Sequence, residues 1–391
     1  MLEREAMAIL VSTQGVQYAA REAALRAAGS AEGVLADPYA FVRQLGERGA
    51  QAVRDAVKNA EQILDGIYDA GVHLIVRGEA GYPERLLQIP HAPHLLFVQG
   101  TPDLEDALSV AMVGTREASA YGLRHTKRIA GELAQSGVCI VSGLALGIDA
   151  AAHEGALAGG GRTIAVLGGA IDKFYPSANR SLRDRILDGG GSVVSEYPMG
   201  MPPGKYTFLQ RNRIIAGLTM GVMVTDGPLR SGALKTATDA ADYGREVFAL
   251  PGDVDAPGSA LPHKLIAEGA HLAVSGADIL AVIAPQLRRE IAALRMEKKA
   301  AVQPAGERAA KRAPEVEKAA APEQALSAEL PPDLPQEERA VLDALAQGEM
   351  EFDALCEALG LDGAALGVML MELEMDGYID ALPGLRYAKK A

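Results

Sequence analysis

The sequence is poor in several residue types that mark familiar classes of protein. It has no tryptophan, and only six phenylalanines and two cysteines among 391 residues. Cys139 and Cys356 fall in segments that we expect to be different domains. A disulfide framework and a cysteine-based metal site are therefore not expected, and a reducing, cytoplasmic compartment fits the composition.

Long apolar runs are also absent. No stretch of about 18 apolar residues occurs, so no membrane-spanning helix is expected. The first residues, MLEREAMAILVSTQG, are too acidic and too weakly apolar for a signal peptide. We therefore expect neither a membrane span nor a secretory leader.

Basic residues are outnumbered, 38 against 51 acidic ones, which gives a net charge of −13. Such an excess of negative charge disfavours binding to nucleic acid. The excess is concentrated at the C-terminus, because residues 321–391 carry 15 acidic and 4 basic side chains, whereas residues 101–286 carry 19 and 16. A basic groove is thus compatible with the middle of the chain but not with its C-terminal segment.

Residues 1–70 have the composition of a small helical domain. Alanine, leucine and arginine are frequent in VQYAAREAALRAAG and GERGAQAVRDAVKNAEQIL, and glycines interrupt the segment. We predict short helices in a SAM-like or helix-hairpin-helix-like arrangement. Residues 71–100 predict two short strands around prolines, as an N-terminal extension of the next domain.

The pattern changes at Ser109. Short apolar runs alternate with helix-like segments as far as residue 286. The alternation predicts a parallel sheet covered by helices on both faces, which is an α/β doubly wound, Rossmann-like core over residues 71–286. The predicted strands are SVAMV, VCIVS, TIAVLGG, SVVSE, GVMVTD, EVFALPG and HLAVSG.

Two further segments follow the core. Residues 287–335 are rich in Ala, Pro, Lys and Glu without sustained apolar periodicity, which predicts a linker. Residues 336–391 predict three short helices and a two-stranded wing, the pattern of a winged-helix module.

Glycines and small polar residues follow several of the predicted strands. Ligands of an open α/β sheet bind at the carboxyl ends of its strands, and glycine turns at helix N-termini supply free N–H groups. These turns therefore predict a surface that holds several phosphate groups. The residues are Gly114, Thr115 and Arg116 after SVAMV, Ser142 and Gly143 after VCIVS, and Ser231 and Gly232 after GVMVTD.

The stretch QRNRIIAG adds cations to this set. Arg211 and Arg213 flank Asn212 at the expected start of a helix, and Lys205 lies six residues upstream of Arg211. Such donors suit backbone phosphates or base edges. A solvated helix start is the alternative for this triplet.

Signatures of nucleotide cofactors are missing. There is no GxGxxG after the first strand and no P-loop lysine, so dinucleotide redox chemistry and P-loop hydrolysis are disfavoured and no cofactor is expected. Asp149 and His153 would share a helix face, but no nucleophile or metal partner is evident beside them. We expect structural roles for both, and for Glu196 at a strand end.

These segments, in this order, resemble the DprA/Smf family of DNA-processing proteins. The resemblance implies a cytoplasmic homodimer that binds single-stranded DNA during natural transformation and loads the recombinase RecA onto it, with no established catalytic activity. It rests on GYPERLLQIPHAPHLLFVQG, VGTREASAYG, SGLALGIDAAAHEGAL, TIAVLGGAIDKFYP, SEYPMG, RNRIIAGL and SGALKTATDAADYGREVFALPGD, within about residues 70–280. It also implies Arg116 as a main phosphate ligand, and the further candidates for the same positive pocket are Lys173, Arg180, Lys205, Arg211 and Arg213.

The sequence departs from the family pattern near the expected pocket. Leu146 stands where SGLALGID usually has an arginine, so one expected cation is missing. Lys235 in SGALKTA adds a charge near the same edge. Leu261-Pro262-His263 replace the Gly-x-Asn that usually precedes the LI of KLIAEGA. Individual DNA contacts are therefore expected to differ from the family pattern.

Two other functions stay open. A nucleotide-cleaving enzyme of the related phosphoribohydrolase type would use carboxylates such as Glu196 and Asp226, but its PGGxGT signature is absent. A transcription regulator would use the winged helix, whose acidic charge would repel duplex DNA. Four aromatic residues could stack on unpaired bases, with core packing as the alternative: Tyr121, Tyr175, Tyr206 and Phe208.

Overall fold

The computed structural model divides the chain into two compact units, residues 1–304 and 305–391. It describes residues 2–104 and 108–287 of the first unit. In the second unit it describes residues 336–346, 348–359, 366, 369–370, 373, 378–382 and 386–390. All of the predicted linker beyond Leu287 lies outside the described residues.

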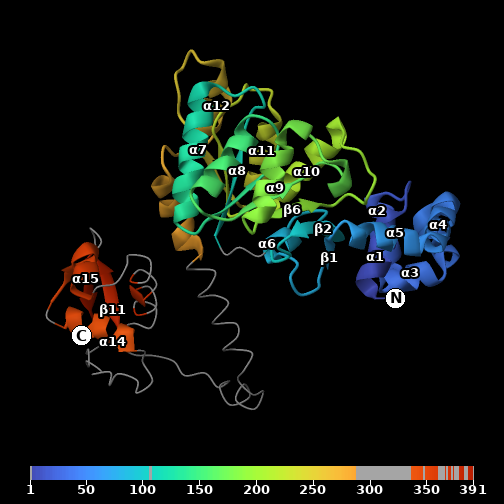
Figure 1. The fold of residues 1–391 in the computed structure, drawn as a ribbon, viewed down its shortest axis with the longest axis horizontal. Helices are drawn as coiled ribbons and strands as arrows, with labels where there is room; N and C mark the ends of the chain where they lie inside the picture. Colours follow the sequence, from blue (N-terminus) through green and yellow to red (C-terminus); the bar gives the residue numbers. More distant parts are fainter. Residues whose placement is uncertain are drawn as a thin grey trace, which may run out of the picture. The chain divides into compact units, whose positions relative to one another are not determined.

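The N-terminal segment is helical, as predicted. Its helices pack their apolar residues together, and residues such as Ile9, Val53 and Ile67 form one hydrophobic cluster with Val72 and Phe97 of the neighbouring strands. The helices therefore pack onto the edge of the sheet (Figure 1), while their SAM-like or helix-hairpin-helix-like class stays a prediction. They are α1 (Glu3–Ser12), α2 (Tyr18–Ala28), α3 (Ala31–Ala36), η1 (Pro38–Phe41), α4 (Val42–Lys58) and α5 (Ala60–Asp69).

One nine-stranded sheet forms the centre of the first unit. Its order is β1-β2-β6-β5-β4-β3-β7-β8-β9, and all neighbours from β6 to β9 are parallel. The two strands expected within residues 71–100 are present and extend the sheet as an antiparallel edge. The strands are β1 (Val72–Val76), β2 (Leu95–Gly100), β3 (Ser109–Val113), β4 (Cys139–Ser142), β5 (Thr163–Val166), β6 (Ser192–Ser195), β7 (Gly221–Val224), β8 (Glu246–Ala249) and β9 (His271–Leu272).

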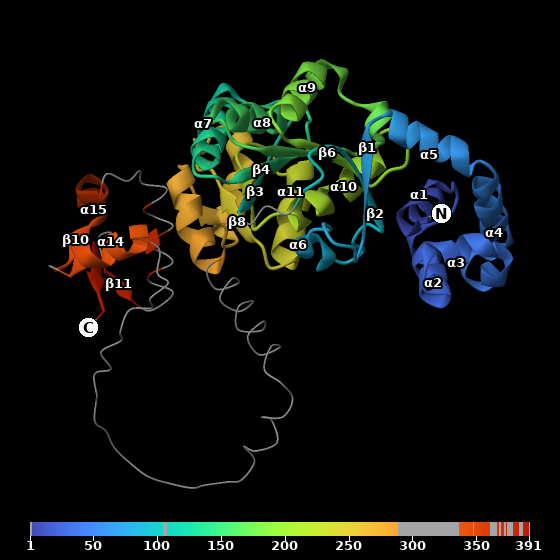
Figure 2. The ribbon, with the colours of Figure 1, turned by 60° about the horizontal axis from the view of Figure 1, so that its bottom comes forward.

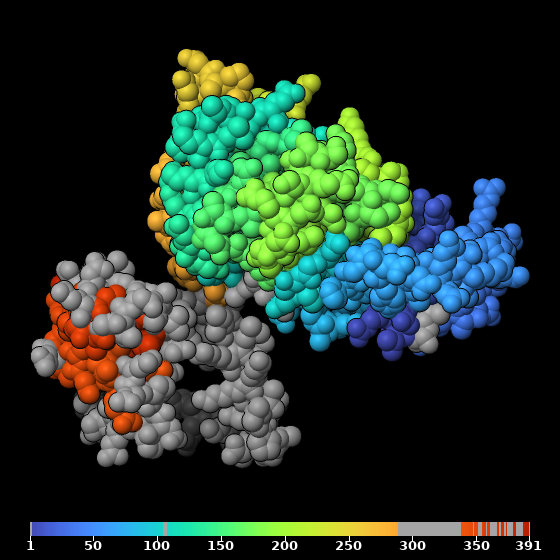
Figure 3. Space-filling model, viewed as in Figure 1, coloured from blue at the N-terminus to red at the C-terminus, as the bar shows by residue number. Residues whose placement is uncertain are grey.

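Helices cover both faces of this sheet, which confirms the doubly wound α/β prediction. Successive residues of β3 face opposite layers, so Val110 and Met112 pack with one set of helices and Ala111 and Val113 with the other. Figure 2 shows the two layers, and Figure 3 shows the first one from outside. The first layer is α7 (Ala120–Gln135), α8 (Ile148–Ala158) and α9 (Arg180–Asp188), and the second is α6 (Glu84–Leu87), α10 (Lys205–Gly217), α11 (Gly232–Asp242) and α12 (Ala260–Ala267).

Short 3₁₀ turns and one more helical stretch complete the first unit. The 3₁₀ turns are η2 (Ile171–Lys173), η3 (Ser177–Asn179) and η4 (Pro257–Ser259). Residues 276–287 are helical and place Ile279 and Ile283 in the core beneath α7.

The second unit has the winged-helix pattern that the sequence predicts. The expected wing is the antiparallel pair β11–β12, and β10 joins β12 as a third strand. Val341, Leu355, Leu366 and Ile379 share its hydrophobic core. The elements with defined bounds are α14 (Gln336–Leu345), β10 (Met350–Glu351), α15 (Phe352–Leu359), β11 (Ile379–Leu382) and β12 (Arg386–Lys389).

The strand order fixes where a ligand can bind. From β3 the chain winds through β4, β5 and β6 on one side, and then returns to place β7, β8 and β9 on the other. The carboxyl ends of β3 and β7 therefore flank the point where the winding reverses. In open α/β sheets this point is the ligand-binding crevice.

The contact between α7 and α8 depends on a glycine and yields a stability prediction. A Cβ at Gly155 would lie 2.3 Å from the Lys127 carbonyl oxygen and 2.8 Å from Ala130 Cβ. Gly155→Ala should therefore lower the free energy of unfolding by about 1–3 kcal/mol through overpacking. Chemical denaturation of the full chain measures this change.

Gly131→Ala is the matched control on the facing helix. Its Cβ would lie 3.4 Å from the Gly155 carbonyl oxygen, an ordinary contact, and alanine favours the helix by about 1 kcal/mol over glycine. We expect a neutral or stabilising effect. Equal effects of the two substitutions would contradict this account of the interface.

Candidate functional site

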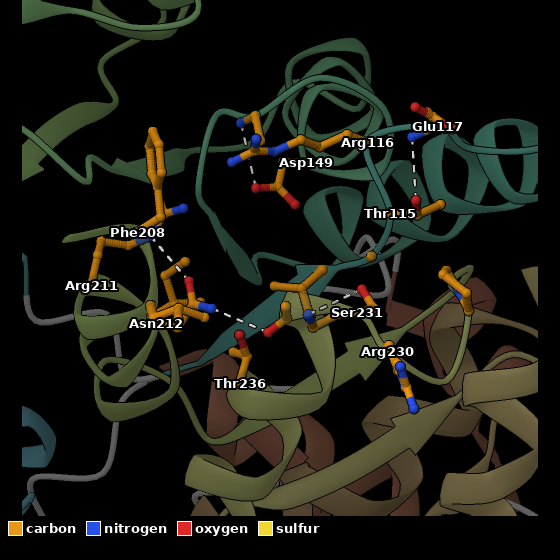
Figure 4. Close-up of a pocket in the computed structure, with 18 of the residues that line it drawn as sticks. Thr115, Arg116, Glu117, Asp149, Phe208, Arg211, Asn212, Arg230, Ser231 and Thr236 are labelled. Carbon is orange, nitrogen blue, oxygen red and sulfur yellow. Dashed lines mark hydrogen bonds between the residues drawn. The ribbon is translucent and has the colours of Figure 1, made fainter. Parts of the chain in front are cut away.

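A cavity of about 480 Å³ lies at the point where the winding of the sheet reverses (Figure 4). Four segments form it: the turn after β3, the start of α8, the first three turns of α10, and the β7–α11 connection. The residues that line it are Val113, Gly114, Thr115, Arg116, Glu117, Ala145, Asp149, Lys205, Phe208, Leu209, Arg211, Asn212, Ile215, Pro228, Arg230, Ser231, Gly232, Ala233 and Thr236.

The turn after β3, residues 114–117, is clamped from two sides. Thr115 donates its backbone N–H to the carbonyl oxygen of Asp226 (2.8 Å), and its own carbonyl accepts from the Ile148 N–H (3.2 Å). A Cβ at Gly114 would lie 2.5 Å from Ile148 Cγ1 and 2.6 Å from the Asp226 oxygen, so only glycine fits. This turn carries Arg116 into the cavity.

Arg116 is exposed and its guanidinium carbon lies 5.0 Å from the centre of the Phe208 ring. Figure 4 shows its side chain extending across the cavity toward α10. A cation–π contact orients the guanidinium without using its N–H donors. Phe208 has room for its ring because position 168 is glycine, where a Cβ would come within 2.5 Å of Phe208 Cδ1.

Two helix N-termini point at the same space. α11 begins at Gly232, and its cap residue Ser231 accepts from the Ala233 N–H (3.2 Å). α8 begins directly after Gly147, where a Cβ would lie 2.4 Å from the Thr115 carbonyl oxygen. Helix N-termini carry partial positive charge and bind anions. Asp149 in the first turn of α8 also lines the cavity, and its carboxylate accepts from the Gly143 N–H (3.2 Å) in the turn before the helix.

Arg211 and Asn212 belong to the wall of the cavity. α10 begins at Lys205, so RNR lies in the helix interior and not at its start as predicted. The helix starts earlier because Gly204 takes an extended conformation and donates its N–H to the Thr207 hydroxyl (2.8 Å). Arg211 is only 4% exposed.

The guanidinium of Arg211 is engaged with strand ends. Its Nη1 donates to the carbonyl oxygens of Gly143 (2.8 Å) and Val166, and its Nε to the Asn212 side chain. Burial lowers the pKa of Arg211 and raises that of Asp149, and the charge of each opposes the shift of the other. The pair thus holds the carboxyl ends of β4 and β5 beside the cavity.

Several residues of the predicted site lie outside the cavity lining. Ser142 is buried and donates to the Met112 carbonyl, and Gly143 packs against the guanidinium of Arg211. Lys173 lies 3.6 Å from Asp172, and Lys235 pairs with Asp239 one turn along α11. These four residues, with Arg180 and Arg213, do not share the cavity with Arg116.

Arg180 and Arg213 show why sequence proximity to the motifs misleads. Arg180 is exposed at the first position of α9. Arg213 donates to Glu196 (2.6 Å) on another side of α10, because residues two apart on a helix point in different directions. The prediction that both join Arg116 in one pocket is therefore corrected.

Arg230 and Thr236 line the cavity but are not among the predicted phosphate-binding residues. Arg230 is exposed in the short turn between β7 and α11. Thr236 lies one turn into α11 and is buried. The sequence signal for Arg230 is that it directly precedes Ser231 and Gly232, which are predicted at this edge of the sheet.

The carboxylates considered for catalysis are engaged elsewhere. Asp226 accepts from the Ser119 N–H (2.9 Å) and hydroxyl (2.5 Å) at the start of α7. Glu196 pairs with Arg213, and neither carboxylate lines the cavity. His153 is buried and hydrogen-bonded to Thr163 (2.7 Å), and it does not line the cavity.

Among the described residues, no cluster of His, Cys, Asp or Glu has the arrangement of a metal site. No helix in that part of the chain has the length and apolar character needed to span a membrane.

Comparison with known proteins identifies the family. Residues 73–284 match the family model described as DNA recombination-mediator protein A, and residues 319–384 match the DprA winged helix domain. Protein Smf of Escherichia coli is 44% identical over 223 residues, which are 57% of this chain and 60% of that relative. DNA processing protein DprA of Streptococcus pneumoniae is 48% identical over 200 residues, 51% of this chain and 70% of that relative.

Two solved structures have the same fold. The X-ray structure of the Streptococcus pneumoniae protein superposes with a TM-score of 0.61 at 36% identity, covering 70% of this chain and 95% of that one. The structure of DNA processing protein A from Helicobacter pylori concerns its single-stranded DNA binding mode. It superposes with a TM-score of 0.50 at 29% identity, covering 56% of this chain and 98% of that one. The chain described here belongs to the DprA/Smf family of DNA recombination-mediator proteins.

Proposed function

We propose that this protein binds single-stranded DNA through backbone phosphates, protects the incoming strand and helps load RecA during natural transformation and homologous recombination. The observation that carries the proposal is the cavity at the reversal point of the sheet. There the cations Arg116, Lys205 and Arg230 meet the N-terminus of α11. The single-strand binding described for the Helicobacter pylori relative supports it.

The donors of the cavity suit phosphates irrespective of base sequence. Backbone N–H groups and cationic side chains contact phosphate oxygens, which carry no sequence information. The Phe208 ring beside Arg116 adds a surface on which an unpaired base can stack. A volume of about 480 Å³ accommodates a small ligand or one nucleotide unit of a strand.

We propose no catalytic role and no cofactor for this cavity. Asp226 acts as a structural acceptor at the start of α7, and Glu196 pairs with Arg213. The carboxylates that do line the cavity are Asp149, which is held by backbone N–H groups, and Glu117 on the β3 turn. This arrangement favours binding over nucleotide cleavage.

We further propose that the protein acts in the cytoplasm as a homodimer. β9 is the last strand of the sheet, and beyond it no described strand pairs. Leu272 on this edge is 55% exposed, and Val274 follows it as another exposed apolar residue. An open edge with apolar side chains favours pairing with a second chain.

The acidic C-terminal module is proposed to contact protein, not DNA.

Arg116→Ala tests the phosphate site. We expect affinity for a labelled oligo-dT of a few tens of nucleotides to fall at least tenfold, about 1.4 kcal/mol. The log–log salt slope should decrease in magnitude by about 0.7, because one phosphate contact is lost. Fluorescence anisotropy at two salt concentrations, with duplex DNA as competitor, measures both quantities.

Arg54→Ala is the matched control, since Arg54 is an exposed arginine in the N-terminal helices. It should change affinity less than twofold. If wild type fails to bind single strands even at low salt, the proposal is wrong. Release of base from nucleoside monophosphates would then support the nucleotide-cleaving alternative.

Leu146→Arg tests whether the edge accepts another phosphate contact. Leu146 is 43% exposed and precedes Gly147, which packs against the carbonyls of Thr115 and Arg116. An arginine there should strengthen binding about threefold or more and increase the salt slope by about 0.7. Leu146→Gln, which adds no charge, should leave the slope unchanged; equal slopes for the two variants would contradict the prediction.

Leu272→Glu tests the dimer edge. A buried carboxylate in an apolar interface is strongly unfavourable, so the variant should sediment as a monomer at concentrations where wild type is a dimer. Leu87→Glu serves as control, because Leu87 is similarly exposed but lies on α6. An unchanged dimer in the Leu272 variant would place the interface elsewhere.

A further inference from the structure

One of the four aromatic residues that the sequence offers for base stacking is exposed and lies next to the proposed phosphate site. Tyr175 belongs to the loop after η2 and is 52% exposed, although its ring is large and apolar. Its ring centre lies 6.0 Å from that of Phe208, with the two planes inclined by 45°. Such a pair is within the range of aromatic contacts.

Phe208 therefore joins Tyr175 to the cavity. Its ring has the Arg116 guanidinium 5.0 Å from its centre, Gly168 gives it space, and its position on α10 lines the cavity. A continuous series of contacts thus runs from the cavity to the surface through Arg116, Phe208 and Tyr175. Tyr175 is its outer member and does not line the cavity itself.

The other two exposed tyrosines near the core differ from Tyr175 in their contacts. Tyr121 donates its hydroxyl to the Pro251 carbonyl (2.7 Å) and packs on His125. The hydroxyl of Tyr206 accepts from Gln210 (2.9 Å). Neither residue lines the cavity or contacts Phe208 among the ring contacts of the described residues. Tyr175 is therefore the tyrosine placed to extend the site.

We infer that Tyr175 is a second base-stacking position, which receives the unpaired base next to the one on Phe208. The inference rests on the proposed binding of single-stranded DNA and adds to it a binding position outside the cavity. Consecutive bases of a single strand can stack on neighbouring aromatic rings without regard to sequence. A tyrosine suits this exposed position, because its ring presents a stacking face while its hydroxyl stays hydrated.

The test separates stacking from phosphate binding. The probes are labelled hexamers of one backbone length that are abasic except for zero, one, two or three adjacent central thymines. The number of phosphates is constant, so only base stacking changes along the series. Because the thymines are few, the strand cannot slide to place a different thymine on a vacant aromatic ring. Anisotropy titrations use the full-length protein.

Wild type should gain at least about fivefold in affinity with the first thymine and again with the second. In Tyr175→Ala the second gain should vanish while the first remains. Tyr175→Phe should retain both gains, because the ring is kept. The salt slope should be unchanged in Tyr175→Ala, since stacking releases no counterions, whereas Arg116→Ala reduces it.

Controls keep the outcomes distinct. Tyr39→Ala removes an exposed tyrosine of the N-terminal helices and should behave as wild type, and thermal unfolding confirms that each variant is folded. Two results would overturn the inference and leave the phosphate site intact. One is that Tyr175→Ala keeps the gain in affinity from the second thymine. The other is that wild type gains affinity from the first thymine but not from the second. Failure of wild type to bind an all-thymine hexamer, with Arg116→Ala indistinguishable from it, would overturn both.

Discussion

The architecture of the site depends on the backbone clamp between the ends of β3 and β7. The Thr115 N–H binds the Asp226 carbonyl, while the Thr115 carbonyl accepts from the first residue of α8. The side chain of Asp226 simultaneously holds Ser119 at the start of α7. Two strands and two helices are thereby fixed to one turn. Since Arg116 sits on that turn, its position over the cavity is set by the backbone.

Close approach of main chains is what makes this clamp possible. Glycine at 114 lets the turn contact Ile148 and Asp226, and glycine at 147 lets α8 start against the carbonyls of the β3 turn. Gly143 likewise leaves room for the guanidinium of Arg211. The cost of burying that charge is offset by two carbonyl acceptors and the nearby Asp149. Buried polar residues therefore stiffen the cavity wall, and the exposed cations stay available.

Cations at the edge of the sheet consequently divide into two groups. Arg116, Lys205 and Arg230 line the cavity and are exposed. Arg213, by contrast, forms an ion pair with Glu196, beside Tyr197. Side-chain charge alone does not separate these groups, because all four residues are cations that follow the strands of one sheet edge. The proposed binding of single strands irrespective of base sequence needs only the first group, together with an aromatic ring for the base.

The sequence by itself determined the α/β alternation, the two strands before the core, the winged-helix pattern and the place of the Gly-Thr-Arg turn at the end of a strand. These features are local, since strand and helix periodicity and turn chemistry act over a few residues. Only the tertiary structure decided that Arg211 is buried, that Lys173, Arg180 and Arg213 lie outside the cavity, and that Arg230 and Phe208 join Arg116. The reason is that helix phase and the reversal of strand order bring Arg116 together with residues 92 and 114 positions along the chain. Neither can be read from spacing alone.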